Sequence, residues 1–265
     1  MPRQVTAFSN STVKLLRSLR DKKARRIEGL FLAEGLRILT EARDSGRLPE
    51  IVAFSAEGAR HPLAAEIIAA TEAAGGDAIE TTPDILTKMS GKDNPQMLLG
   101  AYRQPDTGLA HIDRAKAPLW IVAQALRDPG NLGTILRTGD AVGAGGLILI
   151  DDSADPFSVE AVRASMGALF TQAIATARWP EFVDWCRGGE GELVGTSLKA
   201  SQDYLTAEYR RPCFLLIGNE QQGLPADYEA ECDLLVKIPM AGRADSLNAA
   251  MATAVMAFAI KASWR

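Results

Sequence analysis

The stretch that decides the fold is residues 119–138, LWIVAQALRDPGNLGTILRT. It opens with a nearly continuous apolar run, which is typical of a parallel strand buried on both faces of its sheet. The polar residues RDPG follow, and apolar side chains then recur at helical spacing over residues 132–142. Asn131 stands where the N-cap of that helix is expected. A buried strand, a polar loop and a helix in this order predict a βαβ unit.

The same alternation continues through the second half of the chain. We expect strands at 119–125, 146–150, 193–197, 214–218 and 234–238, and helices at 132–142, 159–170, 181–187 and 247–261. A series of this kind predicts a doubly wound parallel sheet. Ligands of such sheets bind in the loops that follow the carboxyl ends of the strands, and the informative polar segments of this chain fall in those loops.

The first hundred residues predict a second, smaller α/β unit. Residues 10–26 are expected to form one basic helix capped by Ser9 or Asn10, and short strands and helices alternate after it. Residues 103–116 interrupt the alternation with proline, glycine and mixed polar residues. We therefore expect two domains, residues 1–105 and residues 117–265.

The charge of the chain is unevenly distributed. The net charge is −4, yet residues 1–26 hold eight basic side chains and one acid, so this segment carries +7 and the remaining 239 residues carry −11. Because salt screens charges separated by more than about 10 Å, a concentrated cationic segment can bind phosphates even on an acidic protein. A solvated helix face accounts for the same pattern when charge alone is considered.

Several function classes are disfavoured by what the sequence lacks. The longest uncharged, mostly apolar run is 249–260, twelve residues, which is too short to cross a membrane. The first residues have no apolar core of a secretory signal, so we expect a cytoplasmic protein. The three cysteines and two histidines have no ligand spacing, and no metal site is expected.

Three polar segments follow predicted strands. They are LRDPGNLGTILRT at 126–138, LIGNEQQGLP at 216–225 and IPMAGRADSLN at 238–248. Each has an explanation without function: a capped helix, a simple turn, and a second helix capped by Ser246 or Asp245. Glu220 indicates that the second segment is more than a simple turn, because a carboxylate directly after a buried strand needs a partner or open water.

The common nucleotide and hydrolase signatures are missing from the sequence. The chain has no Walker A lysine loop, no G-x-S-x-G elbow and no G-x-G-x-x-G after a strand. The glycine-rich run at 143–146 precedes a strand instead of following one. A Rossmann-type dinucleotide enzyme, which would share this sheet, is therefore disfavoured.

The order of the three polar segments resembles the three motifs of the SpoU/TrmH branch of the SPOUT superfamily, a group of RNA 2′-O-ribose methyltransferases. Residues 128–138 resemble Asp-Pro-x-Asn-x-Gly-x-x-x-Arg-Thr, residues 218–224 resemble Gly-Asn-Glu-x-x-Gly-Leu, and residues 238–248 resemble Ile-Pro-Met-x-Gly-x-x-x-Ser-Leu-Asn. Three motifs in the family's order, each after a predicted strand, make the resemblance specific.

The first half resembles the substrate-binding domain that often precedes the methyltransferase domain in this family and is similar in fold to ribosomal RNA-binding proteins. The matching residues are Asn10-x-x-Val13-Lys14, Phe31-x-x-Glu34-Gly35-x-Arg37 and Asn94-Pro95-Gln96. The resemblance makes the basic N-terminal segment a candidate RNA contact. The candidate RNA-binding residues are Lys14, Arg17, Lys22, Lys23, Arg25, Arg26 and Arg37.

The resemblance implies more than residue spacing can show. It implies a trefoil knot near the C-terminus, S-adenosylmethionine bent inside that knot, and a homodimer formed through the C-terminal domain. Judged by their positions in the sequence, the residues that would line the cofactor pocket are Thr196, Gly218, Ile238 and Leu247. The implied catalytic residues are Arg137, Asn131, Glu220, Ser246 and Asn248.

The implied reaction places a ribose 2′-oxygen roughly 3–3.5 Å from a sulfonium methyl group and removes the hydroxyl proton. Arg137 either loses a proton transiently or stays charged and orients a phosphate, and we favour the second role because guanidinium rarely releases its proton. Asn131 would position Arg137 or the ribose. Glu220 would hold Arg137 or the cofactor's amino group.

Ser246 and Asn248 would fix the RNA or a neighbouring loop through hydrogen bonds, and no metal is required for methyl transfer. The resemblance favours ribosomal RNA over transfer RNA as the substrate. The alternative is an RNA-binding or ribosome-assembly module on the same fold that has lost catalysis. The presence of all five motif side chains disfavours this alternative.

Overall fold

The computed structural model describes residues 2–92, 96–219, 222–243 and 245–265. The chain divides into two compact units, which we call the first unit (Met1–Pro105 with Asp155–Thr171) and the second unit (Asp106–Ala154 with Gln172–Arg265). This division differs from the expected domain boundaries in one segment: Asp155–Thr171 lies within the second domain in sequence but groups with the first unit. No helix in the described ranges is long and apolar enough to span a membrane.

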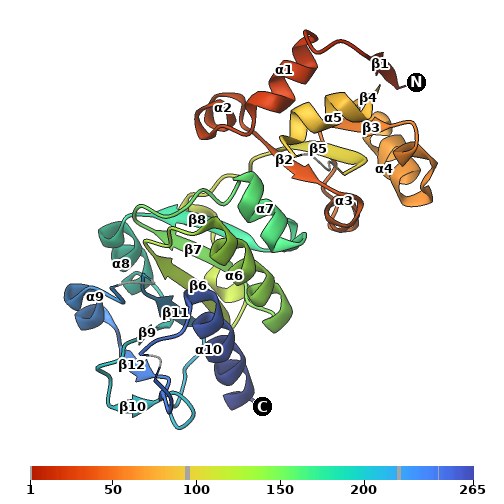
Figure 1. The fold of residues 1–265 in the computed structure, drawn as a ribbon. Coiled ribbons are helices and arrows are strands. Elements are labelled where there is room, and N and C mark those ends of the chain that lie inside the picture. The colour runs from red at the N-terminus through yellow and green to blue at the C-terminus, as the bar shows by residue number, and fades with distance from the viewer. Residues whose placement is uncertain (1, 93–95, 220–221, 244) are drawn as a thin grey trace. The chain divides into compact units, whose positions relative to one another are not determined.

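The second unit is built on a seven-stranded sheet whose order is β10-β12-β9-β11-β6-β7-β8, with every pairing parallel (Figure 1). The predicted doubly wound parallel sheet is therefore confirmed, and β8 and β10 are added to the five expected strands. The strands are β6 (Leu119–Gln124), β7 (Gly146–Ile150), β8 (Ala173–Ala177), β9 (Glu192–Thr196), β10 (Gln202–Asp203), β11 (Cys213–Ile217) and β12 (Leu234–Lys237).

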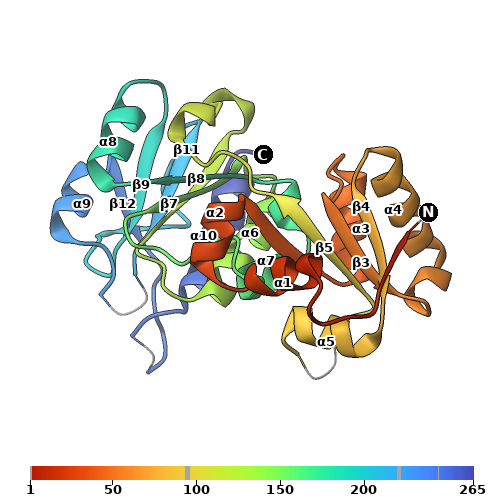
Figure 2. The ribbon, with the colours of Figure 1, turned by 90° about the horizontal axis from the view of Figure 1, so that it is seen from above.

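Helices cover both faces of this sheet. On one face α6 (Pro129–Val142) and α10 (Ala249–Ser263) pack against each other, as Figure 1 shows. On the other face α8 (Trp179–Arg187) and α9 (Ala226–Glu231) contribute aromatic side chains to the core, and Figure 2 shows both helices beside β9. Two short 3-10 helices, η2 (Leu109–His111) and η3 (Arg114–Lys116), precede β6.

The first unit has a mixed five-stranded sheet of order β1-β4-β3-β5-β2, in which β5 runs antiparallel to both neighbours. Its strands are β1 (Arg3–Val5), β2 (Leu30–Glu34), β3 (Ile51–Ser55), β4 (Asp77–Thr81) and β5 (Leu98–Arg103). Its helices are α1 (Ser11–Ser18), α2 (Lys22–Glu28), α3 (Leu36–Asp44), α4 (Pro62–Ala73), α5 (Pro83–Ser90) and α7 (Val159–Ser165), with 3-10 helices η1 (Gly58–Arg60) and η4 (Ala168–Phe170). The separate N-terminal α/β domain is thus confirmed.

The expected basic helix over 10–26 is two helices, so that expectation was wrong. The side chain of Asn10 accepts a hydrogen bond from Thr12 N and caps α1, as predicted. The chain then turns, and Asp21 accepts hydrogen bonds from Lys23 N and Ala24 N at 2.8 and 3.2 Å. A second N-cap residue inside the basic segment starts a new helix, which explains the break.

The segment Asp155–Thr171 is held in the first unit by charge and by aromatic packing. The guanidinium of Arg25 reaches Asp155 Oδ2 with N–O distances of 2.5 and 3.1 Å, and the two side chains are only 4% and 14% exposed. Phe157 and Phe170 pack against Phe31, with ring centroids 5.2 and 5.9 Å away. The expected single helix over 159–170 is interrupted by left-handed Met166, and α7 and η4 lie on either side of the break.

Candidate active site

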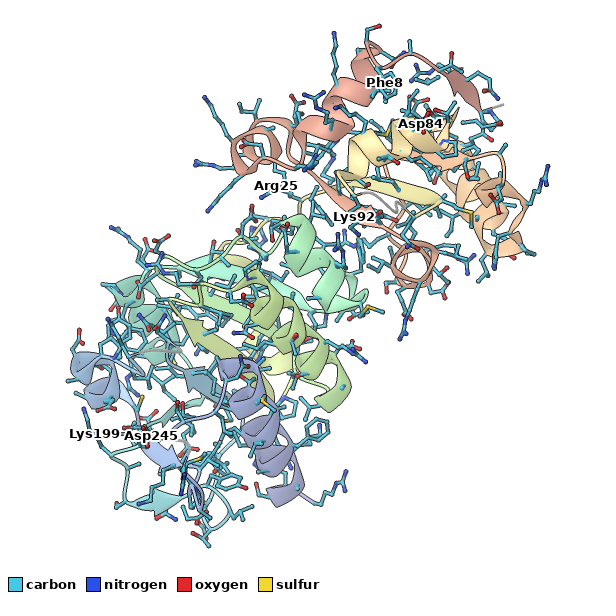
Figure 3. All side chains as sticks on the ribbon, in the orientation of Figure 1. Phe8, Arg25, Asp84, Lys92, Lys199 and Asp245 are labelled. Carbon is cyan, nitrogen blue, oxygen red and sulfur yellow. The ribbon has the colours of Figure 1, made fainter. Side chains whose placement is uncertain are left out.

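A cavity of about 470 Å³ lies beyond the carboxyl ends of β9, β11 and β12, and we call it the first cavity. All four residues expected to hold the cofactor line it: Thr196, Gly218, Ile238 and Leu247. Charged side chains stand among apolar ones in its wall, and Figure 3 labels two of them, Lys199 and Asp245. Its volume is typical of pockets for ligands of nucleoside size.

The loop after β11 folds back tightly on itself at one wall of the first cavity. A Cβ on Gly218 would lie 2.4 Å from the carbonyl carbon of Gly223 and 2.5 Å from Leu224 N, so only glycine fits. Gly223 N donates to the carbonyl oxygen of Asn219 at 2.9 Å, and Gly223 takes a φ of 68°. These contacts explain why the segment 218–224 requires glycine at both ends.

A second cavity, of about 700 Å³, adjoins the first and shares Asn219, Gln222 and Gly223 with it. It opens where β6 and β11 pair, which is the position at which the strand order of the sheet reverses. Open α/β sheets bind ligands at such a switch point. Five carboxamide side chains line this second cavity: Gln124, Asn131, Asn219, Gln222 and Asn248.

The first and third polar segments meet in the second cavity. Asn248 Nδ2 donates to Asn131 Oδ1 at 3.0 Å, which joins two residues 117 positions apart. Asn131 is available for this contact because it is not the N-cap of α6, contrary to the sequence expectation. The cap is Asp128, whose carboxylate accepts from Asn131 N at 2.6 Å, and Pro129 fills the first helical position.

Asn248 also caps α10, so the expected caps Ser246 and Asp245 were wrong. Its Oδ1 accepts hydrogen bonds from Ala250 N and Met251 N at 2.9 and 3.3 Å. Because Oδ1 accepts the capping hydrogen bonds of α10, Nδ2 of the same side chain is directed to Asn131. One side chain therefore starts α10 and fixes the third segment against the first.

Asn219 and Gln124 are site residues that the sequence analysis missed. Asn219 Nδ2 donates to the carbonyl oxygen of Ala125 at 2.9 Å, and Ala125 has a φ of 47°, which is uncommon for a residue with a side chain. Gln124 is the last residue of β6 and is buried. The sequence held one signal that could have identified Gln124, because it is a polar residue at the end of an otherwise apolar strand.

The remaining predicted site residues are less closely grouped. Ser246 lines the first cavity and not the second. Arg137 is exposed on α6 and lines neither cavity. At 1.5 Å per residue it lies about 9 Å farther along the helix than Asn131. Glu220 lies outside the residues that the structure describes.

The predicted RNA-binding side chains fall into two groups. Lys14, Arg17, Lys22, Lys23, Arg26 and Arg37 are exposed in the first unit. Arg25, labelled in Figure 3, is 3% exposed, and besides its pair with Asp155 it donates to the carbonyl oxygens of Leu19 and Arg20 at 2.9 Å. These partners all lie within the first unit, and the burial of the guanidinium disfavours the expected contact between Arg25 and RNA.

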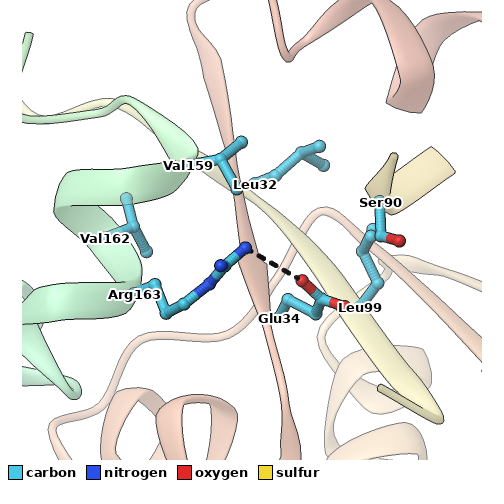
Figure 4. A pocket seen from close by; sticks show the side chains of 7 residues that line it. All are labelled: Leu32, Glu34, Ser90, Leu99, Val159, Val162 and Arg163. Carbon is cyan, nitrogen blue, oxygen red and sulfur yellow. Dashed lines mark ion pairs between the residues drawn. The ribbon is translucent and has the colours of Figure 1, made fainter. Parts of the chain in front are cut away.

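Glu34 forms another internal ion-pair group in the first unit. Its Oε2 lies 2.6 Å from Lys92 Nζ and 3.8 Å from the guanidinium of Arg163, the second of which is drawn in Figure 4. Its Oε1 accepts from Gln96 N at 2.9 Å. The small void that Glu34 borders has a volume of about 10 Å³, room for one water molecule at most.

No cysteine in the second unit is suited to act as a nucleophile. Burial raises the pKa of Cys186 to about 11 and of Cys232 to about 12, and burial raises the pKa of Cys213 as well. All three thiols are free. Within the described ranges, no three His, Cys, Asp or Glu side chains are grouped to hold a metal ion.

Comparison with known proteins identifies the family of both halves. The sequence profile of the SpoU rRNA Methylase family matches residues 118–258, and that of the MRM3-like substrate binding domain matches residues 10–100. The chain belongs to the SpoU rRNA methylase family. The resemblance of the three loop motifs is thereby confirmed.

Relatives of this SpoU methylase match over nearly its whole length. A 23S rRNA (uridine(2479)-2′-O)-methyltransferase of Streptomyces viridochromogenes is 32% identical and covers 91% of this chain and 85% of its own. RlmP of Bacillus subtilis, a 23S rRNA (guanosine(2553)-2′-O)-methyltransferase, is 28% identical over 98% of this chain and 99% of its own. An AdoMet-bound rRNA methyltransferase from Sinorhizobium meliloti superposes with a TM-score of 0.91 at 39% identity, covering 98% and 97% of the two chains.

The first cavity of this SpoU methylase suits S-adenosylmethionine. Gly218 and Gly223 both line this cavity, and a Cβ on Gly218 would lie 2.4 Å from the carbonyl carbon of Gly223, so two closely packed stretches of backbone form this part of the wall. The apolar side chains of Leu224, Ile238 and Leu247 offer a surface for an adenine ring. Acidic and basic side chains in the same wall, Glu229 and Asp245 with Lys199 and Lys237, are complementary to the cofactor's ammonium and carboxylate groups.

Proposed function

We propose that this chain transfers a methyl group from S-adenosylmethionine to a ribose 2′-hydroxyl of ribosomal RNA. The observation that carries the proposal is the pair of adjoining cavities at the switch point of the sheet. One contains the four residues expected to hold the cofactor, and the other is lined by carboxamides from three separate loops. The relatives that act on 23S ribosomal RNA support this RNA class.

The side chains of the second cavity would position the ribose. When bound in the first cavity, S-adenosylmethionine supplies an electrophilic sulfonium methyl group. Asn131 and Asn248 are joined by a hydrogen bond and both line the second cavity, so they are placed to fix a sugar hydroxyl there. Two fixed amides reduce the motion of the nucleophile, and alignment of this kind accounts for a large part of many enzymatic rate enhancements.

Arg137 would orient a backbone phosphate of the RNA. A general base must lie within hydrogen-bond reach of the hydroxyl it deprotonates, and Arg137 is exposed on α6 outside both cavities. A solvated guanidinium keeps its proton and presents a planar fork that suits phosphate oxygens. The exposed position therefore favours the phosphate role over the transient-base role.

Substitution of Arg137 tests the proposal. We expect Arg137→Ala to lower methyl transfer from labelled S-adenosylmethionine to unmodified 23S ribosomal RNA at least 100-fold, while the Kd for the cofactor stays within about twofold. Arg178→Ala is the matched control, because Arg178 is an exposed arginine of the same unit. Full activity of Arg137→Ala would refute the assigned role. Tight RNA binding by the wild-type protein with no methyl incorporation would instead favour the RNA-binding module.

We propose that the first unit binds RNA and the second unit carries the catalytic site. The exposed basic side chains on α1, α2 and α3 support the first assignment, since phosphate contacts need accessible cations. About six such contacts would make RNA affinity fall steeply with salt. The expected cytoplasmic location stays a prediction.

A homodimer through the second unit and a trefoil knot belong to the same proposal. Met251, Val255 and Phe258 are 61%, 36% and 52% exposed and follow one another at spacings of four and three on α10. Such a stripe is typical of a helix face that a second copy covers. The knot is proposed because the chain belongs to the SpoU rRNA methylase family, to which the resemblance attached it.

A further inference from the structure

Gln124 ends β6, an inner strand of the second sheet, in an unusual position for a polar residue. Side chains on one face of a strand recur every second residue, so Gln124 shares its face with Trp120 and Val122. Both of these lie in the apolar core cluster. Gln124 itself is 9% exposed and so continues a row of buried apolar side chains.

The carboxamide oxygen of Gln124 is buried and has no hydrogen-bond partner among the described residues. A buried polar atom without a partner costs about 1–3 kcal/mol in stability. Leucine or methionine at this position would fill similar space without that cost. An unsatisfied acceptor at the end of an apolar row therefore points to a partner that is absent when the protein is alone.

The position of Gln124 indicates what that partner is. The residue lines the second cavity together with Asn131 and Asn248, which are joined by a hydrogen bond, and with Asn219, which donates to the carbonyl oxygen of Ala125. A cavity of about 700 Å³ accommodates a nucleoside. An amide oxygen accepts hydrogen bonds only, so it cannot pair with a phosphate, which offers no donor at neutral pH. Nucleobases carry N–H donors on their edges, and carboxamides commonly pair with them.

We propose that Gln124 is a specificity-determining residue that accepts a hydrogen bond from an N–H group of the nucleobase whose ribose is methylated. The inference rests on the proposed function and names the nucleobase as the part of the substrate that enters the second cavity. Asn131 and Asn248 would hold the sugar of the same nucleotide, and Gln124 would hold its base.

The first test separates recognition from folding. In full-length protein, Gln124→Leu and Gln124→Met remove the acceptor while keeping the size of the side chain. We expect an unchanged or higher Tm, an unchanged Kd for S-adenosylmethionine, and a 10- to 100-fold lower kcat/KM for 23S ribosomal RNA from cells that lack the protein. Unchanged kcat/KM in both variants would overturn the inference, and so would a lower Tm accompanied by loss of cofactor binding.

The second test asks whether the base is the partner. Once the methylated nucleotide is mapped, two RNA oligonucleotides spanning it are compared, one natural and one abasic at that nucleotide with its ribose intact. We expect wild-type protein to prefer the natural RNA at least tenfold and Gln124→Leu to treat both nearly alike. Equal penalties for both proteins would overturn this inference alone. Absence of methyl transfer by the wild-type protein to any of these RNAs would overturn the proposed function as well.

Discussion

The two units use similar polar residues in opposite ways. At the carboxyl edge of the second sheet, polar side chains from separate loops face cavities of about 470 and 700 Å³. In the first unit, Glu34 forms an ion pair with Lys92 at 2.6 Å and Arg25 forms one with Asp155 at 2.5 Å. The void beside Glu34 has a volume of only about 10 Å³. Buried polar groups form a site where packing leaves room for a ligand, and they act as internal supports where it does not.

The largest effect expected from this comparison concerns the first cavity. We predict that Gly218→Ala abolishes S-adenosylmethionine binding, because the added Cβ would lie 2.4 Å from the backbone of Gly223 and force the loop to move. Gly108→Ala is the matched control, since Gly108 lies outside the three motifs and a Cβ there would meet only the side chains of Asp106 and His111, at 3.3 and 3.7 Å. Isothermal titration calorimetry with the cofactor measures both. Equal affinities of the two variants would show that the loop around Gly218 does not shape the pocket.

An intermediate effect is expected for the internal cations of the first unit. We predict that Arg25→Met destabilises the protein by about 3–5 kcal/mol, because Asp155 would be left as a buried charge without its partner. The neighbouring Arg26 is exposed, so Arg26→Met should leave the free energy of unfolding unchanged. Arg26→Met should instead weaken RNA binding, and the slope of log K for RNA binding against log salt concentration should become shallower by about 1.

Urea denaturation and RNA titrations at several salt concentrations distinguish the two arginines. If Arg25→Met unfolded no more easily than Arg26→Met, the ion pair with Asp155 would not support the first unit. If Arg26→Met bound RNA as tightly as wild type at low salt, α2 would not be part of the RNA surface.

The smallest effect is expected for a partly exposed ion pair of the second unit. Although burial raises the pKa of Asp233, hydrogen bonds from Leu193 N and the Arg187 guanidinium hold it below its usual range. The carboxylate therefore stabilises the folded protein above the unfolded pKa of about 3.9, and this contribution is lost as the pH falls through the lower folded value. We predict that Asp233→Asn costs about 1 kcal/mol at pH 7.

Urea denaturation of wild type and Asp233→Asn from pH 7 to pH 3 measures this difference. It should be constant near neutrality and shrink at the acid end of the series. A difference that grew on acidification would mean that the folded protein raises the pKa of Asp233.

The sequence predicted the second sheet well because its strands are buried on both faces and read as unbroken apolar runs. Local chemistry was harder to predict. Residues 128 and 131 are both good cap residues, and the choice of Asp128 depends on Pro129 and on the partner that Asn131 finds far away at Asn248. The two-residue strand β10 has too little pattern to recognise.

Gln124 shows a different limit of sequence reasoning. Its place in an apolar row marks it as unusual, but only the structure shows that its oxygen has no partner among the described residues and that it borders a cavity. Similarly, Arg25 belongs to a cationic run that predicts RNA contact, and only the structure reveals its internal partner 130 residues away. Both outcomes depend on long-range contacts that local patterns do not encode.

The crossover segment Asp155–Thr171 bears on how this protein can be dissected. Because it groups with residues 1–105, the polypeptide passes between the two units three times, at residues 105–106, 154–155 and 171–172. A fragment starting at residue 106 would carry Phe157 and Phe170 without the rings they pack against, and Asp155 without Arg25. Neither unit can therefore be removed by a single cut in the chain, and exchanging the first unit between relatives would require transferring residues 155–171 together with the N-terminal hundred residues.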